Sequence, residues 1–537
     1  ALGRELAGRS AGGAGVFRMG WASERMMTWA MSTPAFKAEL FRLVDVFPAT
    51  TGQVDALTHM REYFSDPETP RLLRLGVGAA GRVPGGARLA AGVARHNIAR
   101  MARQFIIGSD AGEVTARAGE LWEAGKASTV DLLGEKTLNQ AEADVYARRV
   151  LEITEGLADA AAAWPSRPLL DADDLGPVPR PSVSVKPTAL SPHFQPMSAA
   201  AGLEEVEGRL EPILKAAAAR GVLVWLDMEH YDVKDVTLQL LGRLAERSGL
   251  EDLQLGIVIQ AYLQDADRDL TEVVEHSALR VTAGRPPLWV RLVKGAYWDA
   301  ETIHARAEGW SPPVWPSKPH TDAAYERLTR LLHDRHGAVR AAFGSHNVRS
   351  IAHAVSYARA LGIPDHGYEI QMLYGMAEPL HDAVRRSGLR LRVYAPMGEL
   401  VPGMSYLVRR LLENTANDSF VRLRFAEGAD LDALLAPPAP GALTPTSPAR
   451  KPPARKPPAH KPPAHKPNGH SAGGPGGLPP YQHEPPVELR QGRARATFGR
   501  ALEDLGAEIA GAPRQVPLII GGERAMTAVT APSLNPA

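Results

Sequence analysis

The stretch Val222-Leu-Val-Trp-Leu-Asp227, with the segment that follows it, decides how this chain folds. The run is short and apolar, which is typical of a buried strand. A helical spacing of apolar residues follows from Val236 to Ser248, and a second apolar run, Leu255-Gly-Ile-Val-Ile-Gln260, comes next. Strand, helix and strand in this order predict a βαβ unit and therefore a parallel sheet.

The same alternation recurs along the chain from about residue 127. Eight β-rich runs occupy residues 128–133, 182–186, 222–227, 255–260, 288–293, 341–345, 368–373 and 389–394. Helical patterns lie between them, for example at 203–219 and 377–387. Eight such units predict an α/β fold, a closed (β/α)8 TIM barrel. The alternative is a doubly wound open sheet, which would need a Gly-rich first turn that the chain lacks.

Composition narrows the possible functions of the 537 residues, a length that suits about two to four domains. Lys and Arg total 61 against 60 Asp and Glu, so no basic field favours a nucleic-acid partner. No cysteine is present, which excludes disulfides, thiolate metal sites and a Cys nucleophile within the chain. No apolar stretch reaches the roughly 20 residues that span a bilayer.

The segments on either side of the barrel differ in character. Residues 1–125 are predicted to be a helical N-terminal region, with helical spacing at 36–47 and 54–63. Gly76-Val-Gly-Ala-Ala-Gly81 matches GxGxxG but lacks a preceding strand, so we interpret it as a Gly-rich connection. The barrel is assigned to residues 126–428 and a Pro-rich linker with a Lys-Pro-Pro-Ala repeat to 429–481.

Residues 482–537 form a tail that is too short for a domain of its own. It contains one helical pattern, 490–505, and one strand-and-turn pattern, 516–523. An extended Pro-rich spacer cannot pack a core, so we expect the linker to isolate this tail from the barrel. The lack of an initiator Met and the end at Asn535-Pro-Ala537 predict a fragment of a longer protein.

Polar residues gather at the carboxyl ends of the predicted strands, where barrels of this type carry their reacting groups. They are Asp131, Glu135, Lys186, Asp227, Glu229, Gln260, Arg291 through Trp298, Ser345-His-Asn347 and Tyr394. Any one of them is more often structural than catalytic, but their recurrence at one end of successive strands indicates a site.

Arg291 interrupts the apolar run Trp289-Val-Arg-Leu-Val293 and is predicted to point into the barrel. A buried guanidinium needs an anionic or electron-rich partner. The following Lys294-Gly-Ala-Tyr-Trp298 adds a cation and two aromatic rings, a set that suits an aromatic cofactor with phosphates. Motifs for zinc hydrolysis, a P-loop or a serine nucleophile are lacking, and no metal site is expected.

A helix is predicted at Tyr406-Leu-Val-Arg-Arg-Leu-Leu-Glu413, directly after the last strand. Tyr406, Arg409, Arg410 and Glu413 share one face because they recur at helical spacing. Two adjacent guanidinium groups can grip one carboxylate, so this face predicts a small carboxylate substrate.

These motifs resemble the proline dehydrogenase domain of the proline utilization A family. The resemblance covers about residues 35–425. It rests on Val185-Lys-Pro-Thr-Ala-Leu-Ser-Pro192, Leu226-Asp-Met-Glu229, Arg291-Leu-Val-Lys-Gly-Ala-Tyr-Trp298, Ser345-His-Asn347, Gln371-Met-Leu-Tyr-Gly-Met376 and Tyr406-Leu-Val-Arg-Arg-Leu-Leu-Glu-Asn414. It implies a distorted barrel that binds FAD and oxidises L-proline to Δ1-pyrroline-5-carboxylate by hydride transfer from C5 to flavin N5. It also implies that the electrons pass on to a membrane quinone.

The resemblance also implies roles for individual residues. Arg409, Arg410 and Lys186 would clamp the substrate carboxylate and Asp227 would hold that cluster in place. Leu373 and Tyr394 would wall the proline ring, with Tyr297 and Tyr406 nearby. The flavin ring would meet Gln260 and Arg291, and the rest of FAD would be held by residues of the strand ends. These are Val293, Lys294, Gly295, Trp298, Ser345, His346, Asn347 and Glu413. Ser345 stands where the family commonly has Thr, which keeps the hydroxyl.

The tail extends the resemblance to bifunctional members of the family. Pro517-Leu-Ile-Ile-Gly-Gly-Glu523 and Ser533-Leu-Asn-Pro-Ala537 resemble the opening of an NAD-dependent aldehyde dehydrogenase domain, whose catalytic Cys the chain lacks. The expected location is cytoplasmic, peripheral on the inner face of the cell membrane. The alternatives are another flavin barrel, such as a methylenetetrahydrofolate reductase, or a non-catalytic scaffold. The Arg409–Arg410 pair favours a small carboxylate over a folate.

Overall fold

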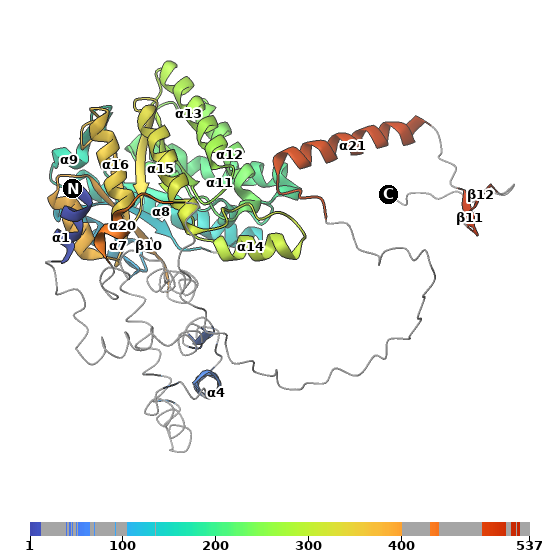
Figure 1. The fold of residues 1–537 in the computed structure, drawn as a ribbon, viewed down its shortest axis with the longest axis horizontal. Helices are drawn as coiled ribbons and strands as arrows, with labels where there is room; N and C mark the ends of the chain where they lie inside the picture. The colour runs from blue at the N-terminus through green and yellow to red at the C-terminus, as the bar shows by residue number, and fades with distance from the viewer. Residues whose placement is uncertain are drawn as a thin grey trace.

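The computed structural model contains a closed barrel of parallel strands, and Figure 1 shows the helices packed around it in the left part of the view. The structure describes residues 1–11, 52–64, 105–134, 136–399, 430–439, 486–511, 517–521 and 523–526, together with residues 39, 42, 43, 46, 50, 69, 88 and 92. The eight barrel strands are β1 (Ala127–Leu132), β4 (Ser182–Val185), β5 (Leu223–Leu226), β6 (Leu255–Gln260), β7 (Leu288–Val293), β8 (Val339–Gly344), β9 (Glu369–Leu373) and β10 (Leu391–Met397). Each overlaps one predicted run.

The strands close in chain order, because β1 pairs in parallel with both β4 and β10. The open-sheet alternative is therefore wrong and the predicted (β/α)8 barrel is confirmed. The helices between strands are α8 (Gln140–Ala162), α11 (Ala199–Arg220), α12 (Tyr231–Glu246), α13 (Ala266–Thr282), α14 (Trp298–Ala307), α15 (Lys318–Asp334), α16 (Val348–Ala360) and α17 (Glu378–Arg386). Short elements fill the connections: α9 (Pro168–Asp171), β2 (Ala172–Asp173), β3 (Gly176–Pro177), α10 (Pro187–Leu190) and η2 (Pro196–Ser198).

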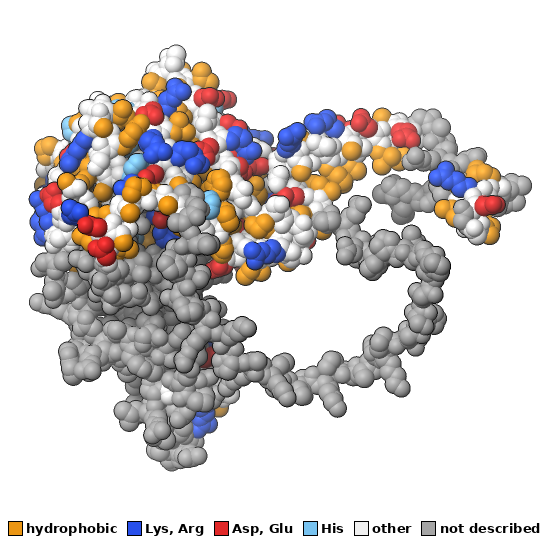
Figure 2. Space-filling model, viewed as in Figure 1, with side chains coloured by type: hydrophobic (Ala, Val, Ile, Leu, Met, Phe, Trp, Pro, Cys, Tyr) orange, Lys and Arg blue, Asp and Glu red, His pale blue; other side chains and the backbone are white. Residues whose placement is uncertain are grey.

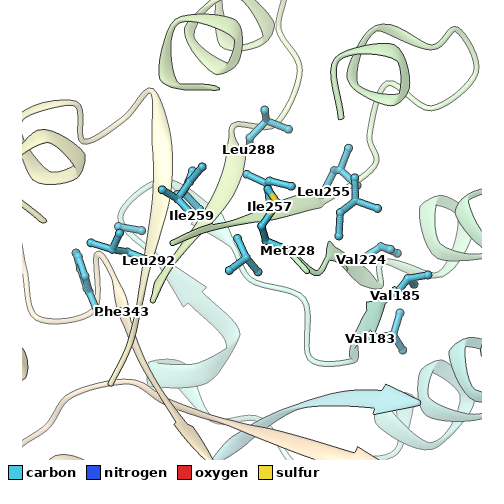
Figure 3. Packing of buried hydrophobic residues seen from close by; sticks show 14 of the residues in the cluster. Val183, Val185, Val224, Met228, Leu255, Ile257, Ile259, Leu288, Leu292 and Phe343 are labelled. Carbon is cyan, nitrogen blue, oxygen red and sulfur yellow. The ribbon is translucent and has the colours of Figure 1, made fainter. Parts of the chain in front are cut away.

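Side chains alternate between the two faces of each strand, and the outward face is apolar. Val183 and Val185 of β4, Val224 of β5, and Ile257 and Ile259 of β6 lie in one buried cluster between strands and helices (Figure 3). Burying such a side chain contributes about 1.5–3 kcal/mol. The hydrophobic core is therefore the layer between barrel and helices.

The inward face carries the opposite set of residues. Trp225 and Trp289 meet edge to face inside the barrel, with ring centroids 6.2 Å apart. Gly256 lies beside them, and a Cβ at Gly256 would stand 2.4 Å from the Trp225 ring. The glycine therefore makes room for a large ring where a β-branched residue would fit the strand better.

Strand β10 runs three residues past its predicted end at Tyr394, to Met397. Pro396, which has no N–H, would ordinarily oppose this extension. The pairing of β10 with β9 stops at Tyr394. The N–H that Pro396 lacks would therefore have had no partner in β9. The Pro396 carbonyl instead accepts the Ile107 N–H at 2.7 Å, and Gly398 donates to the Gly108 carbonyl at 2.9 Å.

Three helices precede the barrel among the described residues. They are α1 (Leu2–Ala11), α4 (Gln53–Tyr63) and α7 (Ala111–Glu123), the last capped by the Asp110 side chain. Helix α1 packs against the barrel through fully buried Leu6, and Arg4 pairs with Asp432 of α20 (Leu431–Leu435) at 2.9 Å. The GxGxxG segment 76–81 and most of 36–47 lie outside the described residues.

The tail contains α21 (Gly492–Gly511) and a hairpin of β11 (Leu518–Ile520) and β12 (Glu523–Ala525). The helix and the strand-and-turn agree with the two predicted patterns. Phe498, Leu502, Leu505 and Ile509 recur at helical spacing and are exposed, and Figure 2 shows apolar side chains along one flank of α21. The start of the helix contacts the barrel, which differs from the isolation expected of a tail behind a Pro-rich linker.

Candidate active site

Asp227 collects three donors at the carboxyl end of β5. Its Oδ1 accepts Arg291 Nη1 of β7 at 3.0 Å, and its Oδ2 accepts the Tyr394 hydroxyl of β10 at 2.7 Å. Lys186, which follows β4, places Nζ 3.5 Å from the same Oδ2. Lys186, Arg291 and Tyr394, each named from the sequence at a strand end, therefore meet on Asp227, although of these three only Lys186 was expected to be held by it.

Lys186 has a second acidic partner, Asp131 of β1, whose Oδ1 it contacts directly. Burial raises the pKa of Asp131, and the Lys186 ammonium offsets that shift only in part. Burial would lower the pKa of Lys186, but Asp131 and Asp227 together outweigh it and raise that pKa. Lys186 is therefore held as an ammonium group at the carboxyl-end mouth of the barrel.

Arg291 lies inside the barrel, with 5% of its side chain exposed. Its guanidinium carbon is 4.2 Å from the centre of the Trp225 ring and 5.0 Å from that of Tyr394. Nε donates to Gln371 Oε1 at 2.5 Å. The prediction that this buried charge needs anionic or electron-rich partners is confirmed by Asp227 and the two rings.

The loop after β7 is shaped by Lys294 and Gly295. Lys294 Nζ pairs with Asp322 Oδ1 of α15 at 2.5 Å. Burial and the nearby Lys318 charge lower the pKa of Lys294 to about 8, although Asp322 opposes the shift. Gly295 has φ 126°, and a Cβ there would stand 2.4 Å from the Tyr262 ring. Only glycine fits this turn.

The turn after β8 presents a helix N-terminus to the same mouth. The Asn347 side chain caps α16 by accepting the Ser350 N–H at 3.1 Å, and Ser345 Oγ accepts the Asn347 N–H at 3.0 Å. His346 Nε2 accepts the Leu373 N–H at 3.1 Å, which links this turn to the end of β9. The first turn of a helix carries partial positive charge and suits an anionic group.

Gln260, at the end of β6 beside Val293 in the strand register, is only half satisfied. Its Nε2 donates to the Glu229 carbonyl at 3.3 Å, while its buried Oε1 has no hydrogen-bond partner among the described residues. Buried polar atoms are ordinarily paired. Gln260 Oε1 is therefore a ready acceptor for a bound group.

Tyr297 and Trp298 lie at the start of α14, farther out. The Tyr297 ring packs on His230 with centroids 4.3 Å apart. Trp298 is 37% exposed and donates its Nε1 to the Trp315 carbonyl at 2.7 Å. Both rings are held at the edge of the site. Tyr406, Arg409, Arg410 and Glu413 lie outside the described residues, as does Glu135.

Comparison with known proteins assigns this barrel to a family. A family profile described as Proline dehydrogenase matches residues 114–423. The chain belongs to the proline dehydrogenase family. A second profile, Proline utilization A N-terminal domain, matches residues 1–105, which fits the predicted helical N-terminal region.

Relatives within the family are of two lengths. The Bifunctional protein PutA of Klebsiella aerogenes is 32% identical over 346 residues, which cover 63% of this chain and 25% of that protein. Proline dehydrogenase 1 of Bacillus subtilis strain 168 is 28% identical over 60% of this chain and 89% of its own length. The chain thus matches about a quarter of the length of its bifunctional relatives.

A solved structure resembles the whole chain. Proline utilization A from Bdellovibrio bacteriovorus, inactivated by N-propargylglycine, superposes with a TM-score of 0.81 and 35% identity. The match covers 98% of this chain and 50% of that one.

Inside the barrel, below the candidate site, lies a layer of buried charged residues to which the sequence analysis gave no role. Gln371 Nε2 donates to Glu369 Oε1 at 2.5 Å, and Glu369 pairs with Arg392 Nε at 3.0 Å. Both ions of this pair are fully buried. The signal was available, because Glu369 and Gln371 alternate with apolar residues in β9, as Arg392 and Tyr394 do in β10. No such signal marks Asp322, which reaches Lys294 from a helix 28 residues away.

Proposed function

We propose that this chain oxidises L-proline to Δ1-pyrroline-5-carboxylate with FAD, the first step of proline catabolism to glutamate, and passes the electrons to a membrane quinone. The carrying observation is the Asp227 cluster at the carboxyl ends of a proline dehydrogenase family barrel. It sets an ammonium, a guanidinium and a phenol around one carboxylate, at the end where such barrels act.

The residues at the mouth fit an FAD. Gln260 Oε1 is a buried acceptor without a partner among the described residues, as the N–H groups of a flavin ring would require. The loop at Gly295 has no room for a Cβ, and Lys294 stands beside it as a buried cation. The capped N-terminus of α16 suits phosphate oxygens. When bound, FAD supplies a two-electron acceptor.

Cofactor binding would therefore use Gln260, Arg291, Val293, Lys294, Gly295, Trp298, Ser345, His346 and Asn347, with Glu413 from the segment after β10. Arg291 is fixed by Asp227 and Gln371, so it does not need to reorganise as charge develops on the bound cofactor. Lys294 would balance phosphate charge, because a buried ammonium with a lowered pKa gains most from an added anion.

The substrate would lie between Lys186 and Tyr394. Lys186 is an ammonium at the mouth and, with Arg409 and Arg410, would hold the proline carboxylate. Tyr394, anchored by its hydroxyl on Asp227, and Leu373 next to it in the strand register would flank the ring. Tyr297 and Tyr406 would lie nearby. No general base is needed when proline binds as the free amine.

The Bdellovibrio relative supports a site of this kind, since N-propargylglycine, which inactivates it, shares with proline a secondary amine and a carboxylate. The test uses purified protein reconstituted with FAD. We expect the visible flavin absorption to bleach on addition of L-proline and denaturation to release FAD. N-propargylglycine should inactivate the protein, and proline should protect against it. Protein that stays colourless with added FAD would refute the proposal.

The tail supports a further part of the proposal, that in a longer protein the barrel is joined to an NAD-dependent aldehyde dehydrogenase domain. The hairpin β11–β12 is highly exposed at Ile519 and Ile520, as expected of strands that belong to a larger sheet. This chain alone should show no NAD-dependent oxidation of glutamate semialdehyde, because it contains no cysteine.

Proteins of this activity would work on the inner face of the cell membrane, where the quinone is. Among the described residues, no helix is both long and apolar enough to cross a bilayer. Vesicles with and without quinone, mixed with the FAD-loaded protein, would test this location. Proline oxidation that is equally fast without quinone or another acceptor would contradict it.

A further inference from the structure

Residues 486–495 lie on the barrel and are called the strap here. The Trp310 indole donates to the Pro486 carbonyl at 2.6 Å, and the Gly492 N–H donates to Asp235 Oδ2 of α12 at 2.5 Å. Burial would raise the pKa of Asp235, but Lys234 and the Gly492 N–H outweigh it and lower that pKa. The strap is thus held at both ends.

Arg490 lies between these two contacts, with 3% of its side chain exposed. Its Nη1 is 3.3 Å from Asp232 Oδ1 of α12 and 3.7 Å from Glu301 Oε2 of α14. Its Nε pairs with Glu488 within the strap at 2.8 Å. The guanidinium also lies 4.9 Å from the Tyr231 ring and 4.8 Å from the Trp310 ring.

The helices that Arg490 joins both begin at the candidate active site. Helix α12 starts at Tyr231, four residues after Asp227, and α14 starts at Trp298, directly after the Lys294–Tyr297 loop. Tyr231 N–H donates to Glu301 Oε1 at 2.8 Å, and the His230 and Tyr297 rings are in contact. The loops after β5 and β7 are therefore joined to each other directly beneath Arg490.

The charges at this junction need a cation. Burial raises the pKa of Glu301 and so does the Asp232 charge, whereas the Tyr231 N–H and Arg490 lower it. Without Arg490, the carboxylates of Asp232 and Glu301 would repel each other. Glu301 would keep its Tyr231 N–H donor and the attraction of His304, whose Nε2 is 3.9 Å from Asp232 Oδ2. Removing one partner of a buried ion pair leaves a costly uncompensated charge.

We propose that Arg490 is a positioning residue for the active site: by bridging Asp232 and Glu301 it fixes the loops that carry Asp227 and Lys294. The proposal rests on the proposed function, since its kinetic readout needs FAD and proline. The strap, which follows the Pro-rich linker in the sequence, would thereby contribute to the reaction in the barrel. The simpler alternative is that Arg490 only anchors the tail.

The experiment compares Arg490→Met, Arg490→Lys and the control Arg500→Met in the full chain. Arg500 is exposed on α21, the helix that begins two residues after Arg490, and it donates a hydrogen bond to Thr497 Oγ1 at 3.4 Å within that helix. Remote residues of this kind change coupling by about 0.5–2 kcal/mol, or about 2- to 30-fold. We expect Arg490→Met to raise the FAD Kd and the proline KM by such a factor, with kcat changing less. Arg490→Lys should restore part of the loss.

A second variant separates positioning from anchoring. Glu301→Gln keeps the acceptor for Tyr231 N–H but removes the charge that Arg490 balances. Added to Arg490→Met, it should bring KM and Kd back toward the wild-type values although the tail remains unpinned. Hydrogen exchange at the Tyr231 amide, which needs no activity, should be faster in Arg490→Met and slower again in the double variant.

The outcomes distinguish the two proposals. Wild-type protein without FAD binding or proline oxidation would count against the proposed function, and Tyr231 exchange would still test the strap. Wild-type activity with Arg490→Met indistinguishable from Arg500→Met, in kinetics and in Tyr231 exchange, would overturn the role of Arg490. Faster exchange in α21 alone, with unchanged Tyr231 exchange, Kd and KM, would also overturn it.

Discussion

Replacing Gly295 by alanine tests how the β7 loop is built. Gly295 has φ 126°, a backbone conformation that other residues rarely adopt. The new Cβ would stand 2.4 Å from two ring carbons of Tyr262, whose side chain is almost completely buried. Tyr262 cannot recede easily, because its N–H bonds to the Lys294 carbonyl at 2.7 Å and its carbonyl accepts the Trp315 N–H at 2.8 Å.

Two costs add at this position. Forcing a non-glycine residue into this conformation costs about 1–3 kcal/mol. Overpacking a rigid ring costs about 1–3 kcal/mol more. Gly295→Ala should therefore lower the free energy of unfolding by about 2–6 kcal/mol. Gly284→Ala is the matched control, because Gly284 has φ 76° and a Cβ added there would meet no heavy atom within 4 Å. It should cost about 1–2 kcal/mol.

The assay is urea unfolding of both variants followed by tryptophan fluorescence, with an FAD titration at low urea. Gly295→Ala should lose more stability than Gly284→Ala, and it alone should weaken FAD binding because Lys294 adjoins the strained residue. Equal losses in the two variants would refute the contact with Tyr262 as the reason for glycine. Unchanged FAD affinity in Gly295→Ala would refute a role of this loop in holding the cofactor.

Three more predictions concern charge. Arg409→Met and Arg410→Met should each weaken proline binding by roughly 10- to 150-fold with FAD retained, since a charge-assisted bond contributes about 1.5–3 kcal/mol; unchanged kinetics would contradict the clamp. Asp227→Asn should lower the free energy of unfolding by about 3–5 kcal/mol, and adding Arg291→Met should recover part of it; denaturation without recovery would argue against direct pairing. The pKa of Lys294 lies at about 8, below the 10.5 of a free lysine, so the unfolded chain binds more protons than the folded chain between pH 8 and 10.5. The free energy of unfolding of the protein without FAD should therefore rise with pH in this range. Lys294→Met should flatten this dependence of the unfolding free energy on pH.

The barrel was predictable because each of its strands is locally apolar and its helices are amphipathic. Runs such as 255–260 and 288–293 were placed with the observed bounds. The end of β10 was not, since the effect of Pro396 depends on where β9 stops pairing. Strand order also followed from chain order, as barrels of βαβ units require.

The candidate site was predictable where strand ends carry charge. Asp227, Lys186 and Arg291 were named from the sequence and do meet. Partners that arrive from helices were not predictable, because no local pattern ties Asp322 of α15 to Lys294. The contact of Arg490 with α12 and α14 was missed for the same reason. A Pro-rich composition predicts that a linker is extended, but it does not predict where the residues after the linker pack.

The hydrogen bond from the Gly398 N–H to the Gly108 carbonyl joins two points of the chain that are far apart in the sequence. The segment 12–104 returns to the barrel at this bond, and the segment that contains Arg409 and Arg410 departs from it. Each residue of chain reaches at most about 3.6 Å, so Arg409, eleven residues on, stays within roughly 40 Å of the entry point of the N-terminal region. The chain therefore enters and leaves the barrel at neighbouring points here, and an insertion made at this junction should disturb both the N-terminal region and the segment proposed to bind the substrate carboxylate.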